Sequence, residues 1–62
     1  MITEQHRHEL LDDARSELRD SAEDLFYAAT LLRRAGDHSA AAAVAKHAQE
    51  LLALASGVGR PS

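Results

Sequence analysis

The stretch LLRRAGDHSAAAAVAKHA, residues 31–48, contains the end of one predicted helix, a turn and the start of a second helix. Two arginines lie in the last predicted turn of the first helix, where positive charges interact favourably with the exposed carbonyl groups. Gly36 follows at the position where a left-handed C-terminal cap is expected. Either Asp37 or Ser39 is able to cap the helix that follows. A connector this short between two amphipathic helices predicts an antiparallel hairpin.

Upstream of the turn, the chain has no Gly or Pro between Thr3 and Ala35. Thr3 is a suitable N-cap, and Glu4 then places an anion in the first turn, where the helix dipole favours it. Apolar residues recur at alternating steps of three and four, which predicts one long amphipathic helix over about residues 3–35. The stripe consists of Leu11, Ala14, Leu18, Ser21, Leu25, Ala28, Leu32 and Ala35, and is widened by Leu10, Ala22, Ala29 and Leu31.

Downstream of the turn, the same spacing predicts a shorter helix over about residues 39–56. Its first two turns are rich in alanine, which has a high helix propensity and allows a neighbouring helix to approach closely. Two glycines and Pro61 end the periodicity. We therefore expect a single all-α hairpin domain over residues 1–56 and a flexible tail over residues 57–62.

The predicted core of this hairpin is thin, because 13 of the 62 residues are alanine, only two are aromatic, and there is no cysteine to form a disulfide. The shorter helix would also leave Leu10, Leu11 and Ala14 without an intrachain partner. Each exposed leucine forfeits about 1.5–3 kcal/mol of burial. The sequence thus predicts a homodimeric helical bundle. Its predicted core and dimer interface are Leu10, Leu11, Ala14, Leu18, Leu25, Ala28, Leu32, Ala41, Val44, Ala48, Leu51 and Ala55.

An alternative arrangement breaks the long helix near its middle. Asp20 with Glu23, or Ser21 with Asp24, has the spacing of a capping box. A helix that begins there would give a compact three-helix monomer. The heptad steps nevertheless run through these positions, and no Gly or Pro marks a break.

The charge is unevenly distributed along the chain. The net charge is −3, but residues 1–24 hold eight acidic against three basic residues, giving −5, whereas residues 25–62 hold two acidic against four basic residues, giving +2. An acidic long helix argues against direct binding of nucleic acid. It leaves open an inhibitor whose carboxylates imitate phosphate groups and occupy a partner's basic site. Candidate residues for partner binding are Asp12, Asp13, Asp20, Asp24 and Tyr27.

Histidines with acidic neighbours suggest a further alternative, a metal-binding helical bundle. Glu4 and His8, and likewise His47 and Glu50, are one helical turn apart. We expect them to be ordinary pairs on solvated faces, and we assign no metal ligand and no cofactor. The sequence also lacks a phosphate-binding glycine loop and any arrangement of Ser, His and acid that indicates nucleophilic catalysis, so we expect no enzymatic activity.

The segment 22–55 resembles one tetratricopeptide repeat. The residues that carry this resemblance are Leu25, Ala28, Ala29 and Leu32, then Gly36 and Asp37 at the turn, and then Ala41, Ala45 and Ala48. The proline that commonly ends such a repeat is missing, as is the aromatic residue near its start. The resemblance implies binding of a partner protein through helices.

Taken together, the patterns predict a small, non-enzymatic, homodimeric helical protein that binds or regulates an unidentified partner protein through a helix face. No run of apolar residues is long enough for a membrane span, and residues 1–10 are too polar for a secretory signal. We therefore expect no membrane partner and, by default, a cytoplasmic location.

Overall fold

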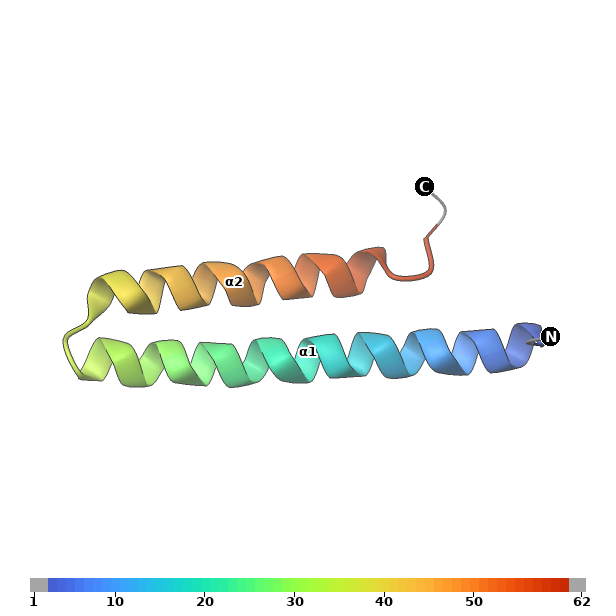
Figure 1. The fold of residues 1–62 in the computed structure, drawn as a ribbon, viewed down its shortest axis with the longest axis horizontal. Helices are drawn as coiled ribbons and strands as arrows, with labels where there is room; N and C mark the ends of the chain where they lie inside the picture. Colours follow the sequence, from blue (N-terminus) through green and yellow to red (C-terminus); the bar gives the residue numbers. More distant parts are fainter. Residues whose placement is uncertain (1–2, 61–62) are drawn as a thin grey trace.

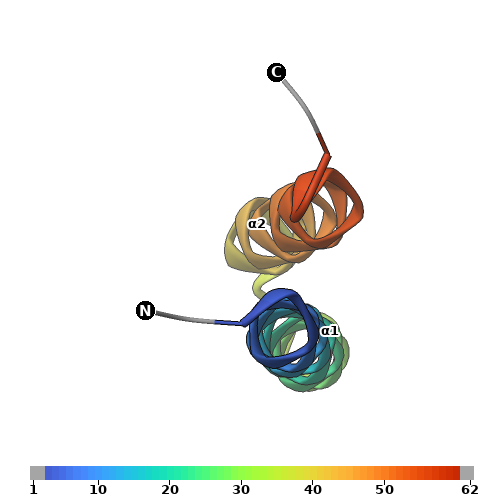
Figure 2. The ribbon, with the colours of Figure 1, turned by 90° about the vertical axis from the view of Figure 1, so that its right-hand side faces the viewer.

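The computed structural model describes residues 3–60, which form two helices, α1 (Glu4–Arg34) and α2 (His38–Gly57). The helices lie side by side and run in opposite directions, so that the start of α1 and the end of α2 are at the same end of the molecule (Figure 1). The view along the helices shows one helix beside the other, with no further layer (Figure 2). The predicted all-α hairpin is therefore confirmed. α1 is continuous through Asp20 and Ser21, so the three-helix alternative is not adopted.

The start of α1 follows the predicted capping pattern. The Thr3 hydroxyl oxygen accepts a hydrogen bond of 3.1 Å from the backbone N–H of His6, and Glu4 lies in the first turn. Thr3 thereby satisfies one of the backbone donors that have no partner within the helix. The long helix thus begins where the sequence predicts.

The turn between the helices is closed by a glycine cap. The backbone N–H of Asp37 donates to the Leu32 carbonyl at 2.9 Å, and the N–H of Gly36 donates to the Arg33 carbonyl at 3.0 Å. This pair of bonds is a Schellman motif, and it requires the left-handed conformation that Gly36 adopts at φ +89°. The Asp37 carboxylate then accepts from the N–H of Ala40 at 3.0 Å, so Asp37 rather than Ser39 caps α2.

The two helices meet along a seam of alanines. The fully buried side chains among residues 3–60 are Ala22 and Ala29 on α1 and Ala41, Ala48 and Ala55 on α2, each 0–1% exposed. On each helix they are seven residues apart, which places them on one side of that helix. Half-buried residues continue the seam between and beyond them, namely Leu11, Arg15, Leu18, Leu25 and Leu32 on α1, Val44 and Leu51 on α2, and Val58 directly after α2.

On α1 the buried stripe differs from the sequence prediction at every second step. In the predicted stripe, the leucines alternate with Ala14, Ser21 and Ala28. In the hairpin, the buried residues that alternate with the leucines include Ala22 and Ala29. Ala14 and Ser21 are exposed, and Ala28 is half-buried. Both series repeat every seven residues beside the same leucines, but burying Ala22 leaves the Ser21 hydroxyl in water. On α2 the predicted stripe and the buried stripe coincide.

The end of α2 also differs from the prediction. The helix includes Gly57, and Val58 is half-buried, so the segment that follows Ser56 continues to pack against α1. Gly59 lies against α1, because an added Cβ would be 3.3 Å from Leu11 Cδ1. Leu11 was expected to have no intrachain partner and is instead half-buried, because the chain continues past α2 far enough to reach it. Residues 61–62 of the predicted tail lie outside the described residues.

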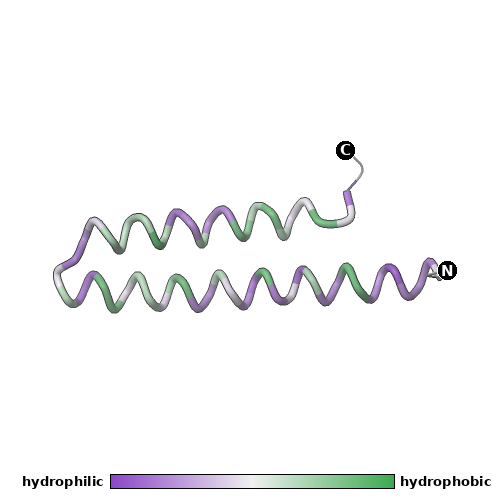
Figure 3. Tube along the Cα trace, in the orientation of Figure 1, coloured by the Kyte–Doolittle hydropathy of each residue, from purple (hydrophilic) through white to green (hydrophobic). Residues whose placement is uncertain are grey.

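Polar and apolar residues alternate along α1 (Figure 3), as expected for a helix with one face against a neighbour. Over residues 3–60, neither helix combines the length and the hydropathy required to cross a bilayer.

Candidate interaction surface

The hairpin exposes five large apolar side chains, and its most completely buried side chains are small. Between residues 3 and 60, the exposed large apolar side chains are Leu10 at 48%, Tyr27 at 65%, Leu31 at 45%, Leu52 at 38% and Leu54 at 61%. Within the same range, every side chain that is more than nine-tenths buried belongs to an alanine. Because the favourable free energy of burial grows with apolar area, the five exposed side chains leave part of the available stabilisation unused in a single chain.

Three of these five side chains lie on one side of the hairpin. Leu10 and Leu31 are 21 residues apart, a multiple of the heptad, and therefore share one side of α1. Ala28 comes directly before the buried Ala29, and Leu54 comes directly before the buried Ala55. Ala28 and Leu54 therefore occupy equivalent heptad positions on the two helices. Equivalent flanking positions lie on the same side of an antiparallel pair. We call the surface formed by Leu10, Ala14, Ala28, Leu31 and Leu54 the leucine face.

The leucine face has a shallow hollow on α2. It is open to solvent and is lined by Glu50, Ala53, Leu54, Gly57 and Val58. Most of its lining surface is apolar. Ala53 has a small side chain and Gly57 has none, which leaves the space beside Leu54 unfilled, so the hollow is suited to an apolar side chain.

The centre of the leucine face is polar. Glu17 and Asp24 continue the seven-residue series of Leu10 and Leu31, and the exposed Ser21 lies between them. The apolar residues of α1 are therefore divided into one group at the open end of the hairpin and one group near the turn.

The residues predicted for partner binding are all exposed, but the helix does not bring them together. Asp13, Asp20 and Tyr27 are seven residues apart and share the side of α1 that faces away from α2. Asp24 belongs to the leucine face. Asp12 lies on the other flank of α1, where Arg15 donates to its carboxylate at 2.6 Å. The acidic residues are thus spread around α1.

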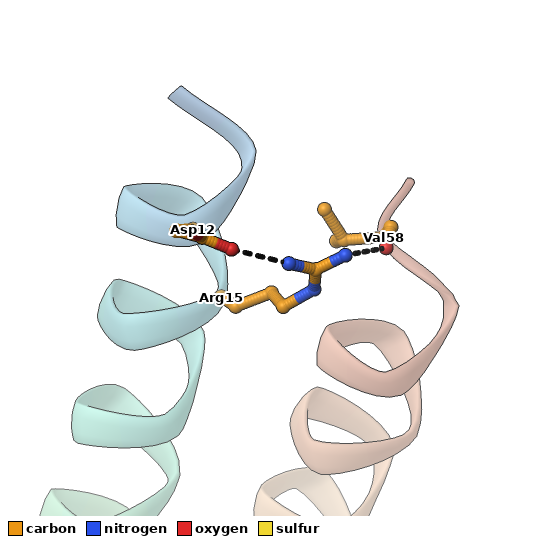
Figure 4. Close-up of polar contacts among 3 residues, drawn as sticks. All are labelled: Asp12, Arg15 and Val58. Atoms are coloured by element: carbon orange, nitrogen blue, oxygen red, sulfur yellow. Dashed lines mark hydrogen bonds and ion pairs between the residues drawn. The ribbon is translucent and has the colours of Figure 1, made fainter. Parts of the chain in front are cut away.

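Sequence reasoning missed the contact that joins the open end of the hairpin. Arg15 occupies the seam position seven residues before Ala22, and its guanidinium also donates to the Val58 carbonyl at 2.8 Å (Figure 4). The positive charge of Arg15 interacts favourably with the partial negative charge at the C-terminal end of α2. The sequence signal that could have indicated this contact is the seven-residue series Arg15, Ala22 and Ala29, in which a long polar side chain occupies a position equivalent to the two alanines.

Three of the four histidines lie near an acidic neighbour on the same helix. His8 Nε2 is 3.3 Å from Glu4 Oε1, His47 Nδ1 is 3.7 Å from Glu50 Oε2, and His6 Nδ1 is 4.0 Å from a Glu9 oxygen. All of these side chains are more than half exposed. Over residues 3–60, no three His, Cys, Asp or Glu residues are grouped to hold a metal ion.

Comparison of the chain with protein-family models, with curated proteins and with solved structures finds no match. The resemblance of residues 22–55 to a tetratricopeptide repeat stays a prediction from the sequence. The class of protein that the fold defines is a two-helix antiparallel hairpin with an alanine seam.

Proposed function

We propose that this protein is a small, non-enzymatic homodimer that binds or regulates a partner protein through a helix face. The observation that supports the proposal is the contrast between five exposed large apolar side chains and a buried seam made of alanine within residues 3–60. So thin a core supplies little stability to an isolated hairpin, whereas association covers more apolar area.

For the partner, we propose the side of α1 that carries Asp13, Asp20 and Tyr27. These residues are exposed at seven-residue spacing and face away from α2, so a partner reaches them without opening the hairpin. Tyr27 is 65% exposed, and tyrosine combines a large apolar ring with a hydroxyl group that tolerates water. The spread of the other acidic residues around α1 favours this reading over imitation of nucleic-acid phosphate, which needs a concentrated field.

The test compares capture of proteins from the source cells by the wild-type chain and by a Tyr27→Ala variant, after crosslinking that preserves complexes. We expect a protein that is captured by the wild type and lost with Tyr27→Ala. Ser16→Ala is the matched control, because Ser16 is exposed on another side of α1, and it should capture the same protein. Recovery of the chain alone, or equal capture by both variants, would contradict the proposal. Light scattering measures the mass in solution independently.

A further inference from the structure

We propose that the leucine face is the docking site for a second copy of this chain, with the two copies related by a two-fold axis and their α1 helices antiparallel. This inference rests on the homodimer of the proposed function and adds its face and orientation. Three observations support a second copy as the occupant of the leucine face: the exposed area of the chain, the positions of its apolar side chains, and the opposite charges of its two halves.

The exposed area matches what one docking partner removes. The chain exposes 4819 Å². A compact monomer of 6.7 kDa exposes about 3900 Å², so the hairpin carries an excess of about 900 Å². A stable protein–protein interface covers about 800 Å² on each partner. One copy docked on each hairpin therefore accounts for the excess.

The leucine face is the side on which such a contact gains most. It holds Leu10, Leu31 and Leu54, whereas Leu52 lies on the opposite flank of α2 and Tyr27 faces away from the hairpin. Alanines adjoin the leucines on α1, so a second helix is able to approach closely. The apolar hollow beside Leu54 lies toward the open end and would receive a leucine from the turn end of the second copy.

The division of the face sets the orientation. Leu10 and Ala14 lie near the start of α1, at the open end, and Ala28 and Leu31 lie near its end, at the turn. An antiparallel pairing places each open-end group on the other copy's turn-end group. It also brings the half of the chain with charge −5 beside the half with charge +2, whereas a parallel pairing would bring the two acidic halves together.

Cysteine crosslinking tests the face and the orientation, because the chain has no native cysteine. Leu10→Cys and Leu31→Cys are made as separate variants, one carrying a mass tag, and are mixed and oxidised. We expect a disulfide between the two variants. Neither variant should crosslink to itself, since two-fold copies of either site are about 30 Å apart along the helices.

Asp20→Cys is the control, because position 20 lies near the middle of α1 but faces away from α2. It should form no crosslink. Crosslinking of Asp20→Cys to itself would contradict the assignment of the dimer interface to the leucine face. Crosslinking of Leu10→Cys to itself would contradict the antiparallel orientation of the two α1 helices. In both cases a dimer mass by light scattering would leave the proposed homodimer standing. A monomer mass would remove the homodimer itself.

A second pair of variants avoids cysteine. Leu31→Ser should raise the dimer dissociation constant at least tenfold, and Leu52→Ser should leave it within about twofold. Circular dichroism checks that both variants stay helical. Equal effects of the two substitutions would contradict the assignment of the leucine face.

Discussion

Alanine at the seam positions sets how closely the two helices approach. Ala48 is 0% exposed and lies in the middle of the α2 series. Ala48→Leu should lower the free energy of unfolding by about 1–3 kcal/mol, because the added atoms have no space between the backbones. Thermal unfolding at equal protein concentration measures the change. Ala42→Leu is the matched control, since Ala42 is exposed on the same helix, and it should be near neutral. A stabilised Ala48→Leu variant would show that the seam holds unfilled space.

Two glycines in different conformations predict opposite effects of the same substitution. Gly36 adopts φ +89°, so Gly36→Ala should destabilise the protein by about 1–2 kcal/mol through backbone strain. Gly57 lies in α2 without a positive φ, and a Cβ added there meets nothing within 4 Å. Gly57→Ala should therefore be neutral or stabilise by up to about 1 kcal/mol. Chemical denaturation of both variants measures the signs, and equal signs would contradict the assigned backbone conformations.

At the scale of the elements, Arg15 joins α1 to the segment that follows α2. Its guanidinium bridges the Asp12 carboxylate and the Val58 carbonyl, and a Cβ added at Gly59 would lie only 2.9 Å from Arg15 Nη2. At the open end of the hairpin, this side chain adds polar contacts to the packing of Leu11 and Val58, whereas the closed end is held by the covalent turn.

Removing that side chain should loosen one end of the hairpin. In Arg15→Ala, we expect the backbone amides of Val58 and Arg60, which bond to Ala55 and Gly57, to exchange hydrogen at least tenfold faster. Asp12→Ala is the control, because it removes the other partner of Arg15 and leaves the bond to Val58. Hydrogen exchange by NMR separates the variants. Unchanged rates in Arg15→Ala would show that Val58 packing alone holds the segment.

At the scale of the whole molecule, the hairpin is a rod. Its extents are 51 × 20 × 13 Å, and its radius of gyration is 15.1 Å, against about 11 Å for a compact chain of this length. An elongated pair of helices has a large surface for its mass. This large surface supports the proposed association of two copies, because a second copy would cover part of it.

The proposed dimer predicts an effect of charge near its two-fold axis. Asp24 lies on the leucine face near the middle of α1, where the second copy brings its own Glu17 and Asp24. Asp24→Asn should therefore lower the dimer dissociation constant by about two- to fivefold at low salt, because it relieves repulsion between carboxylates. Analytical ultracentrifugation measures it. Asp20→Asn removes the same charge from the outer side and should have a smaller effect. A weaker Asp24→Asn dimer would contradict the assignment of the leucine face as the interface.

The sequence by itself determined the elements of this protein. Thr3, Gly36 and Asp37 act through hydrogen bonds with near neighbours in the chain, so both caps and the turn follow from local chemistry. Heptad spacing and a short connector then determined the hairpin. On α2, the predicted stripe was also the buried one.

Only the tertiary structure decided which alanines of α1 are buried. Ala14 and Ala28 belong to one seven-residue series, and Ala22 and Ala29 belong to another, and both series stand beside the same leucines. Local hydropathy does not separate them, because their alanines are chemically identical. The choice depends on how α2 lies on α1, which includes the long-range bond from Arg15 to Val58. That choice turns the series with Ala14 and Ala28 toward the exposed leucines of the leucine face.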